Sequence, residues 1–168
     1  MEEGKLQIYC GSGKGKTTAA IGLAIREASR GRSVFVVQFL KGKYPEEISF
    51  IQRLEPEIKM FRFQKREDSF EDLTPQEKEE EIPNLRNGLN FAKKVLATGE
   101  CDVLILDEVL GLVEAGVIEA EELRALFEAK GEYTSLILTG IYPAKEIWQY
   151  ADEVTEMVTA YKADSSGQ

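Results

Sequence analysis

The chain of 168 residues is 43% hydrophobic and 30% charged, with a formal net charge of −9 at pH 7, which predicts a single globular domain over residues 1–168. The acidic balance argues against a nucleic-acid-binding surface, which is generally basic, and no apolar run reaches the roughly 18 residues that would cross a bilayer. The sequence contains no histidine, and this absence excludes Ser-His-Asp and Cys-His catalytic machinery and every imidazole metal site.

The elements begin directly after an acidic N-terminus, MEEGK, which does not resemble a signal peptide, so we expect a cytoplasmic protein. Apolar runs rich in Val, Ile and Leu are typical of strands buried on both faces of a parallel sheet. Helical patterns alternate with these runs, which predicts an α/β doubly wound domain with a mainly parallel sheet of about six strands. The predicted strands are 5–10, 33–39, 57–63, 102–107, 133–139 and 153–161, followed by a flexible tail at 162–168.

Three helices are expected between these strands. The first covers 16–28 and the third covers 119–131. The second begins at TPQE (74–77), where the threonine is the N-cap, the proline lies in the first turn and the glutamate completes a capping box. It continues to Gly99, and Pro83 is expected to kink or divide it.

The run GSGKGKT (11–17) lies between the first predicted strand and the first predicted helix, which is the context of a phosphate-binding P-loop. Its glycines let backbone N–H groups converge on phosphate oxygens, and the helix N-terminus adds positive potential. Lys16 is expected to reach the terminal phosphates, and the Thr17 hydroxyl to bind Mg²⁺. Lys14 is either a phosphate contact or a solvated side chain. The predicted nucleotide contacts are Gly11, Ser12, Gly13, Lys14, Gly15, Lys16 and Thr17 of this run, and Thr18 directly after it.

A pair of carboxylates, Asp107 and Glu108, follows the fourth predicted strand. The pair could cap the next helix, because acidic residues favour helix N-termini. Beside a P-loop, a metal-ion role with Thr17 is the favoured interpretation. The two cysteines, Cys10 and Cys101, have no metal or redox spacing and are expected to be small buried thiols.

Five segments along the chain resemble the ATP:corrinoid adenosyltransferases, enzymes that attach the 5′-deoxyadenosyl group to the cobalt of cobalamin precursors. The resemblance implies a RecA-like P-loop NTPase fold, a homodimer, and the use of ATP, a divalent cation and a corrinoid, with a flavoprotein as a candidate reductant. In this family the loop also departs from the ordinary first glycine, where this chain has Cys10. The segments are GSGKGKTTAA, VVQFLKG (36–42), LILDEV (104–109), LILTG (136–140) and ADEVTEM (151–157).

The resemblance also implies that the nucleotide lies reversed, so that the loop grips a leaving triphosphate while cobalt(I) attacks the ribose C5′. No proton has to leave the nucleophile, so a chain without histidine loses nothing. Lys16 and Glu108 are the implied catalytic residues, with Asp107 beside them on the metal. Gln38 and Lys41, just past the second predicted strand, lie either in the same crevice or on a solvated loop.

The chain departs from the family pattern at several positions, and these keep two other interpretations open. Ile141 stands where the family usually has an arginine, and the segment before the long helix has Phe61, Phe63 and Phe70 but no tryptophan. The only tryptophan, Trp148, is expected to pack in the core, and the C-terminal segment differs from the basic one of the family. The alternatives are a RecA-like ATPase or phosphotransferase, and a diverged non-enzymatic module that binds ATP and a corrinoid.

Overall fold

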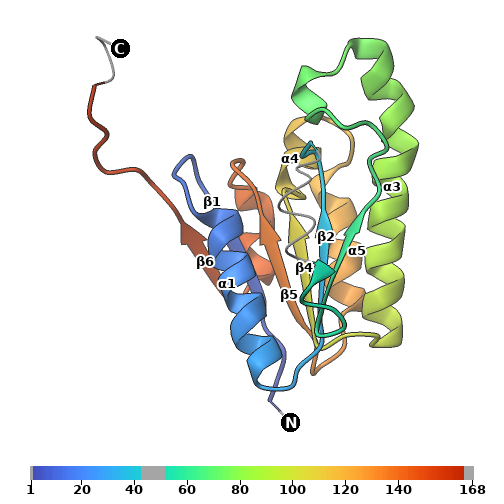
Figure 1. Ribbon diagram of the computed structural model, residues 1–168, viewed down its shortest axis with the longest axis vertical. Helices are drawn as coiled ribbons and strands as arrows, with labels where there is room; N and C mark the ends of the chain where they lie inside the picture. The colour runs from blue at the N-terminus through green and yellow to red at the C-terminus, as the bar shows by residue number, and fades with distance from the viewer. Residues whose placement is uncertain (1, 43–51, 165–168) are drawn as a thin grey trace.

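The computed structural model describes residues 2–42 and 52–164. Its centre is one six-stranded sheet in which every pairing is parallel, in the order β3-β2-β4-β5-β1-β6 (Figure 1). The central strand β4, VLILD, is buried along its whole length, as the continuous apolar run predicts. The strands are β1 (Leu6–Cys10), β2 (Val34–Gln38), β3 (Ile58–Arg62), β4 (Val103–Asp107), β5 (Ser135–Thr139) and β6 (Glu153–Glu156).

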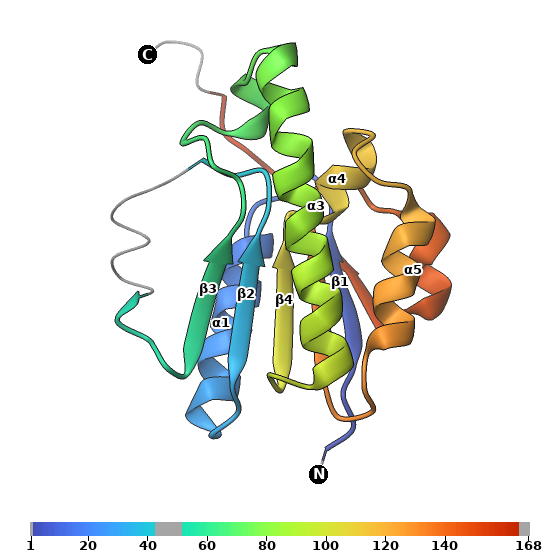
Figure 2. The ribbon, with the colours of Figure 1, turned by 90° about the vertical axis from the view of Figure 1, so that its right-hand side faces the viewer.

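Helices cover both faces of the sheet, so the doubly wound prediction is confirmed (Figures 1 and 2). Alternate residues of β4 point to opposite faces: Val103 and Ile105 pack with α1, while Leu104 and Leu106 join the larger core on the other side. None of the described helices is long and apolar enough to cross a membrane. The helices are α1 (Lys16–Ser29), α3 (Pro75–Thr98), α4 (Leu110–Glu114) and α5 (Ala120–Ala129), with 3-10 turns η1 (Phe70–Asp72) and η2 (Lys145–Tyr150).

The start of α3 is confirmed, but the expectation that Pro83 divides this helix is wrong. Thr74 and Glu77 form the reciprocal capping box, and the helix continues without a break to Thr98. Pro83 is exposed to solvent, while Glu81 and Leu85, two positions away on either side, are buried. Tertiary packing on both sides of the proline therefore outweighs the lost hydrogen bond.

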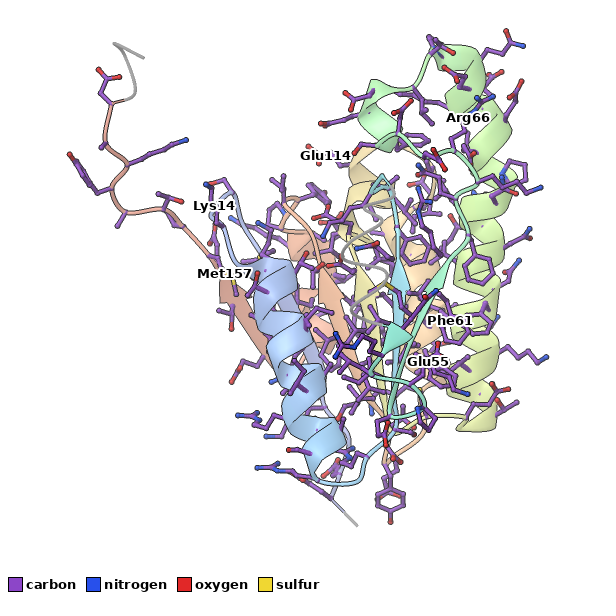
Figure 3. The ribbon with its side chains drawn as sticks, viewed as in Figure 1. Lys14, Glu55, Phe61, Arg66, Glu114 and Met157 are labelled. Atoms are coloured by element: carbon purple, nitrogen blue, oxygen red, sulfur yellow. The ribbon has the colours of Figure 1, made fainter. Side chains whose placement is uncertain are left out.

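The last strand is shorter than predicted, ending at Glu156 instead of residue 161. Its partner β1 ends at Cys10, which pairs with Glu156, so no strand remains for later residues to pair with. Met157 instead binds the P-loop: its N–H donates to Cys10 O and its carbonyl accepts from the Gly13 N–H, both at 2.8 Å. Figure 3 shows Met157 beside the loop that carries Lys14. Residues 165–168 of the predicted tail lie outside the described residues.

The two cysteines are buried free thiols, as expected. Burial raises the pKa of the Cys101 thiol to about 12, and burial also raises the pKa of Cys10. Since the thiolate is the reactive form, neither side chain is prepared for nucleophilic or metal chemistry.

Candidate active site

Asp107, the last residue of β4, is the centre of the site and is 1% exposed. Its Oδ1 accepts hydrogen bonds from the hydroxyls of Thr17 and Thr139, both at 2.8 Å. Its Oδ2 accepts from Lys41 Nζ at 2.8 Å and from Gln38 Nε2 at 3.3 Å. The donors come from α1, β5, β2 and the segment after β2, so this carboxylate joins the P-loop helix to three parts of the sheet edge. We call these five residues the Asp107 cluster.

Lys41 bridges two members of the cluster. Besides Asp107, its Nζ donates to Thr17 Oγ1 at 2.5 Å, so the ammonium lies between a hydroxyl and a carboxylate. The backbone of Lys41 is held independently: its N–H donates to Phe39 O at 2.8 Å, and its carbonyl accepts from an Arg62 Nη2 at 3.1 Å. Gln38 and Lys41 therefore both contact Asp107 at the carboxyl edge of the sheet instead of lying on a solvated loop, and of the two only Lys41 lines the cavity described below.

The P-loop connects β1 to α1 in the predicted way. Gly11 has a φ of 107°, a left-handed conformation that favours glycine, and its N–H donates to Ile141 O at 3.2 Å. Lys16, the first residue of α1, is 8% exposed and donates from Nζ to Gly13 O at 2.6 Å. Lys14 lies exposed at the loop tip (Figure 3). Ser12, Gly15 and Thr18 are also exposed at this end of α1.

Gly13 is a position where the loop approaches Met157 too closely for a side chain. A Cβ at Gly13 would lie 2.7 Å from the carbonyl carbon and oxygen of Met157. We expect Gly13→Ala to lower the free energy of unfolding by about 1–3 kcal/mol, because backbone must move to admit the methyl group. Urea denaturation measures this loss.

The matched control for this prediction is Gly22→Ala in the middle of α1. A Cβ at Gly22 meets nothing within 4 Å, so alanine is expected to raise stability by roughly 0.5–1 kcal/mol through helix propensity. Equal stabilities of the Gly13→Ala variant and the parent would show that the contact with Met157 is loose.

Glu108 has a left-handed backbone with a φ of 64°, unusual for a side chain of this size. Its N–H donates to Thr139 Oγ1 at 2.8 Å. Burial, and next the charge of Asp107, raise the pKa of the Glu108 carboxyl, while the Lys41 and Lys16 ammonium groups oppose this shift. The capping interpretation is not what the structure shows, because α4 begins at Leu110 and has no acidic residue in its first turn. Non-glycine residues in strained conformations are found preferentially at functional sites.

A cavity of about 450 Å³ opens beside the Asp107 cluster. Its lining includes Glu108 and also Ile141, which is 56% exposed. Of the three phenylalanines in the 61–70 segment, only Phe70 lines it. The complete lining is Leu40, Lys41, Ser69, Phe70, Glu71, Lys78, Glu108, Gly111, Glu114, Ala115 and Ile141.

The other two phenylalanines are packing residues. Phe61 and Phe63 lie 4.7 and 5.3 Å from the Phe91 ring, centroid to centroid, and join β3 to α3. Trp148 is half-buried against the core, as expected, and its Nε1–H donates to Pro143 O at 2.6 Å. The aromatic residues of the 61–70 segment therefore divide between core and cavity.

Three residues of the site had not been predicted. Thr139 binds Asp107 and Glu108, and its only sequence signal is its place at the end of a strand-like run, before a glycine. Arg62 holds the Lys41 carbonyl and Met157 braces the loop. Both contacts join segments that lie close together only because of the order of strands in the sheet, so no local sequence pattern predicts them.

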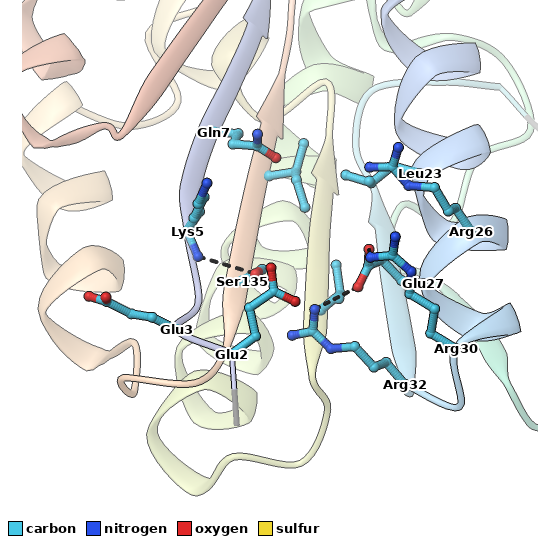
Figure 4. A pocket seen from close by; sticks show the side chains of 12 residues that line it. Glu2, Glu3, Lys5, Gln7, Leu23, Arg26, Glu27, Arg30, Arg32 and Ser135 are labelled. Atoms are coloured by element: carbon cyan, nitrogen blue, oxygen red, sulfur yellow. Dashed lines mark hydrogen bonds and ion pairs between the residues drawn. The ribbon is translucent and has the colours of Figure 1, made fainter.

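A smaller hollow of about 150 Å³ lies beside the amino ends of the strands (Figure 4). Arg32 Nη1 contacts Glu27 Oε2 there at 2.6 Å, and the Lys5 N–H donates to Ser135 Oγ at 3.2 Å. None of the predicted site residues lines this hollow.

A strand, a glycine-rich loop and a helix opened by Lys16 and Thr17, facing an aspartate at the end of a neighbouring strand, define a P-loop nucleotide-binding protein. The family model described as "ATP:corrinoid adenosyltransferase BtuR/CobO/CobP" matches residues 2–168. The chain belongs to this family, so the resemblance seen in the sequence is confirmed. The comparisons give no support to the ATPase or non-enzymatic interpretations.

Curated relatives agree with this assignment. The corrinoid adenosyltransferase of Escherichia coli (strain K12) is 31% identical over 166 residues, covering 99% of this chain and 82% of the relative. The corrinoid adenosyltransferase CobA of Salmonella typhimurium (strain LT2) has the same identity and coverage. The corrinoid adenosyltransferase of Pseudomonas aeruginosa is 28% identical over 167 residues, covering 99% of this chain and 80% of the relative.

Solved structures support the fold alone. The KaiC-like protein PH0186 of Pyrococcus horikoshii OT3 superposes with a TM-score of 0.58 at 16% identity, covering 96% of this chain and 76% of that one. The flagellar accessory protein FlaH of Methanocaldococcus jannaschii superposes with a TM-score of 0.63 at 17% identity, covering 98% of this chain and 76% of that one. The prediction of a RecA-like P-loop fold is therefore confirmed.

Proposed function

We propose that the protein is an ATP:corrinoid adenosyltransferase, which transfers the 5′-deoxyadenosyl group of ATP to the cobalt(I) of a corrinoid and releases triphosphate. The observation that carries the proposal is the position of the Asp107 cluster between the P-loop and the 450 Å³ cavity. Lys41 belongs to both, since it binds Thr17 and also lines the cavity. A nucleotide on the loop and a second substrate in the cavity would therefore meet at one edge of the sheet.

In this reaction the electron pair of cobalt(I) forms the new bond to C5′, while the electrons of the C5′–O bond leave with triphosphate. The protein has to align the two substrates and stabilise the charge that develops on the leaving oxygen. Lys16 and the N-terminus of α1 supply positive potential for this purpose. Because no proton is removed from cobalt, a general base is not required.

The residues present fit a magnesium ion bound together with the nucleotide. The described residues contain no group of three or more acidic or thiol side chains able to hold a metal ion by themselves. Mg²⁺ is usually held by one or two carboxylates, with water and substrate phosphates completing its coordination. The gap between Thr17 Oγ1 and Asp107 Oδ2 already accommodates one cation, the Lys41 ammonium. We propose Thr17, Asp107 and Glu108 as the metal-binding side chains, and the ion would neutralise charge on the triphosphate.

The cavity is the proposed place of the corrinoid. Leu40, Phe70 and Ile141 give it apolar surface next to the cluster, which suits the face of a macrocycle. The homodimer, the cytoplasmic location and the flavoprotein reductant implied by the resemblance belong to the same proposal.

An anaerobic assay with Mg·ATP and chemically reduced cob(I)alamin tests this function directly. The expected result is a light-sensitive adenosylcobalamin spectrum with inorganic triphosphate in equal amount. Orthophosphate without a cobalt–carbon product would instead identify an ATPase. ATP binding without either product would identify a non-enzymatic module.

Glu108→Gln is expected to weaken turnover at limiting Mg²⁺, by on the order of tenfold, because the amide is a poorer metal ligand than the carboxylate. The same change is expected to raise stability at neutral pH. A carboxyl with a raised pKa in the folded state binds its proton more tightly there, so stability falls as pH rises from the ordinary to the raised pKa. Gln removes this loss.

Metal-dependent rates and thermal unfolding between pH 4 and pH 8 measure the two effects together. We expect the stability difference between Glu108→Gln and the parent to vanish at the acidic end, where both side chains are neutral. A variant with parental activity at limiting Mg²⁺ would show that Glu108 is not a metal ligand.

A further inference from the structure

The Lys41 ammonium occupies the position of the proposed metal ion. Its Nζ lies 2.5 Å from Thr17 Oγ1 and 2.8 Å from Asp107 Oδ2. A magnesium ion binds oxygen at about 2.0–2.1 Å. A magnesium ion bound to Thr17 Oγ1 and Asp107 Oδ2 would overlap the Lys41 ammonium. The two cations therefore cannot occupy the site at the same time.

We propose that Lys41 is an internal stand-in cation that makes the site select the metal–nucleoside triphosphate complex over the free metal ion. This inference rests on the metal site proposed above but is independent of corrinoid transfer. It assigns to Lys41 a role in specificity for the form of the substrate, beyond a phosphate contact.

The charges of the site explain the selectivity. Asp107 is nearly fully buried, and its ammonium partner is 26% exposed on the side-chain atoms. A free divalent ion would have to separate this pair, and it would leave the ammonium beside a second cation. A nucleotide changes the balance, because its phosphates supply further ligands to the metal and also provide negative charge for the displaced ammonium. The neighbouring Glu108 carboxyl also belongs to this charged environment, since the charges of Asp107, Lys41, Lys16 and Glu114 all act on its pKa.

The structure lets the Lys41 side chain leave without moving the chain. The backbone before Lys41 is fixed by the bond from Lys41 N–H to Phe39 O and by the bond from Phe70 N–H to Leu40 O, both at 2.8 Å, and the Lys41 carbonyl accepts from Arg62. The lysine side chain is flexible, and Lys41 already lines the 450 Å³ cavity. Binding of metal and nucleotide would therefore displace the Lys41 side chain and change the lining of the cavity.

The first test titrates the intact protein with Mn²⁺ in the absence of nucleotide, with the free ion followed by electron paramagnetic resonance. Lys41→Met is expected to bind Mn²⁺ more tightly than the parent by on the order of tenfold, because the competing cation is gone and Asp107 is left uncompensated. With ATP present, the difference is expected to shrink or reverse. Equal affinities of the parent and a folded Lys41→Met variant for Mn²⁺ alone would overturn the proposal.

Lys78→Met is the matched control, since Lys78 also lines the cavity but lies over the Phe70 ring, 5.6 Å from its centroid. It removes the same charge from the same cavity, and we expect parental Mn²⁺ affinity. A comparable gain in this variant would mean that general electrostatics accounts for the effect, and would overturn the proposal.

A second measurement stays decisive even if Lys41→Met does not fold. A crystal structure of the parent with Mg²⁺ and an unreactive ATP analogue should show Lys41 Nζ separated from Thr17 Oγ1 and directed at phosphate oxygens. Persistence of the Lys41–Thr17 contact beside a bound metal ion would refute the stand-in role. Neither measurement involves a corrinoid, so failure of the transferase assay and failure of this inference are distinguishable.

Discussion

Lys16→Ala is expected to abolish ATP-dependent turnover, with a loss of about 10²–10³-fold or more. Lys16 is the first residue of α1, at the positive end of the helix dipole, and its ammonium is held over the loop by its bond to Gly13 O. Removing a positive group from the place where charge develops on a leaving group typically has an effect of this size. Initial rates with saturating corrinoid, together with ATP binding by calorimetry, separate lost affinity from lost catalysis.

The neighbouring loop lysine provides the control for this prediction. Lys14 is exposed at the tip of the same loop, so Lys14→Ala removes an equal charge from a solvated position, and we expect a loss of less than about tenfold. Thermal unfolding should show both variants folded. A Lys16→Ala enzyme with parental turnover would be incompatible with phosphate binding by this loop.

The parts of the fold that could be predicted are those written in local sequence. The run VLILD has no polar residue before its last position, and a segment of this kind is stable only when both faces are covered. Thr74 and Glu77 satisfy each other's backbone groups within one turn, so the start of α3 follows from four residues. The Gly-Lys-Thr sequence at the end of the P-loop is equally local.

The residues that form the Asp107 cluster could not be predicted from local sequence. Asp107, Thr139 and Gln38 meet because β4 lies between β2 and β5 in the sheet. The order of strands depends on how the whole chain packs, and neither apolar periodicity nor turn residues encode it. For the same reason the position of Lys41 became visible only with the structure, although its presence near the crevice was an open expectation.

The corrected elements also depend on partners distant in sequence. The pattern from 153 to 161 favours a strand, but a strand needs a neighbour, and β1 turns into the P-loop after Cys10. Phe61 lies in β3 and Phe63 directly follows that strand, and their spacing of two residues places both rings on one side, against Phe91 of α3. Phe70 lies in η1, beyond the strand, and only this residue of the three reaches the cavity.

Asp107→Asn is expected to have the second large effect, lowering both the free energy of unfolding and the rate. The carboxylate accepts from four donors, whereas an asparagine amide offers one acceptor oxygen and places an NH₂ group against two of those donors. Lys41 also loses its counter-charge. We expect a destabilisation of about 2–4 kcal/mol and a loss of turnover of about 100-fold or more. Urea denaturation and steady-state rates at saturating Mg·ATP measure the two effects.

Asp102→Asn is the matched control at the other end of β4. Asp102 is exposed and accepts from Ser33 at the amino edge of the sheet, so we expect a loss of at most about 1 kcal/mol and unchanged turnover. A mild phenotype for Asp107→Asn, similar to that of Asp102→Asn, would contradict the central place of this carboxylate.

Combining Asp107→Asn with Lys41→Met separates the two tasks of the cluster. If the stability loss arises mainly from an ammonium left without its carboxylate, removing that ammonium should restore about 1–3 kcal/mol. Turnover should stay low in the double variant, because it lacks both the Asp107 carboxylate for the metal and the lysine for the phosphates. A double variant no more stable than Asp107→Asn would place the cost in the Thr17 and Thr139 hydrogen bonds instead. The main contribution of the cluster to stability would then be the hydrogen bonds that connect α1 to β5, and not the ion pair with Lys41.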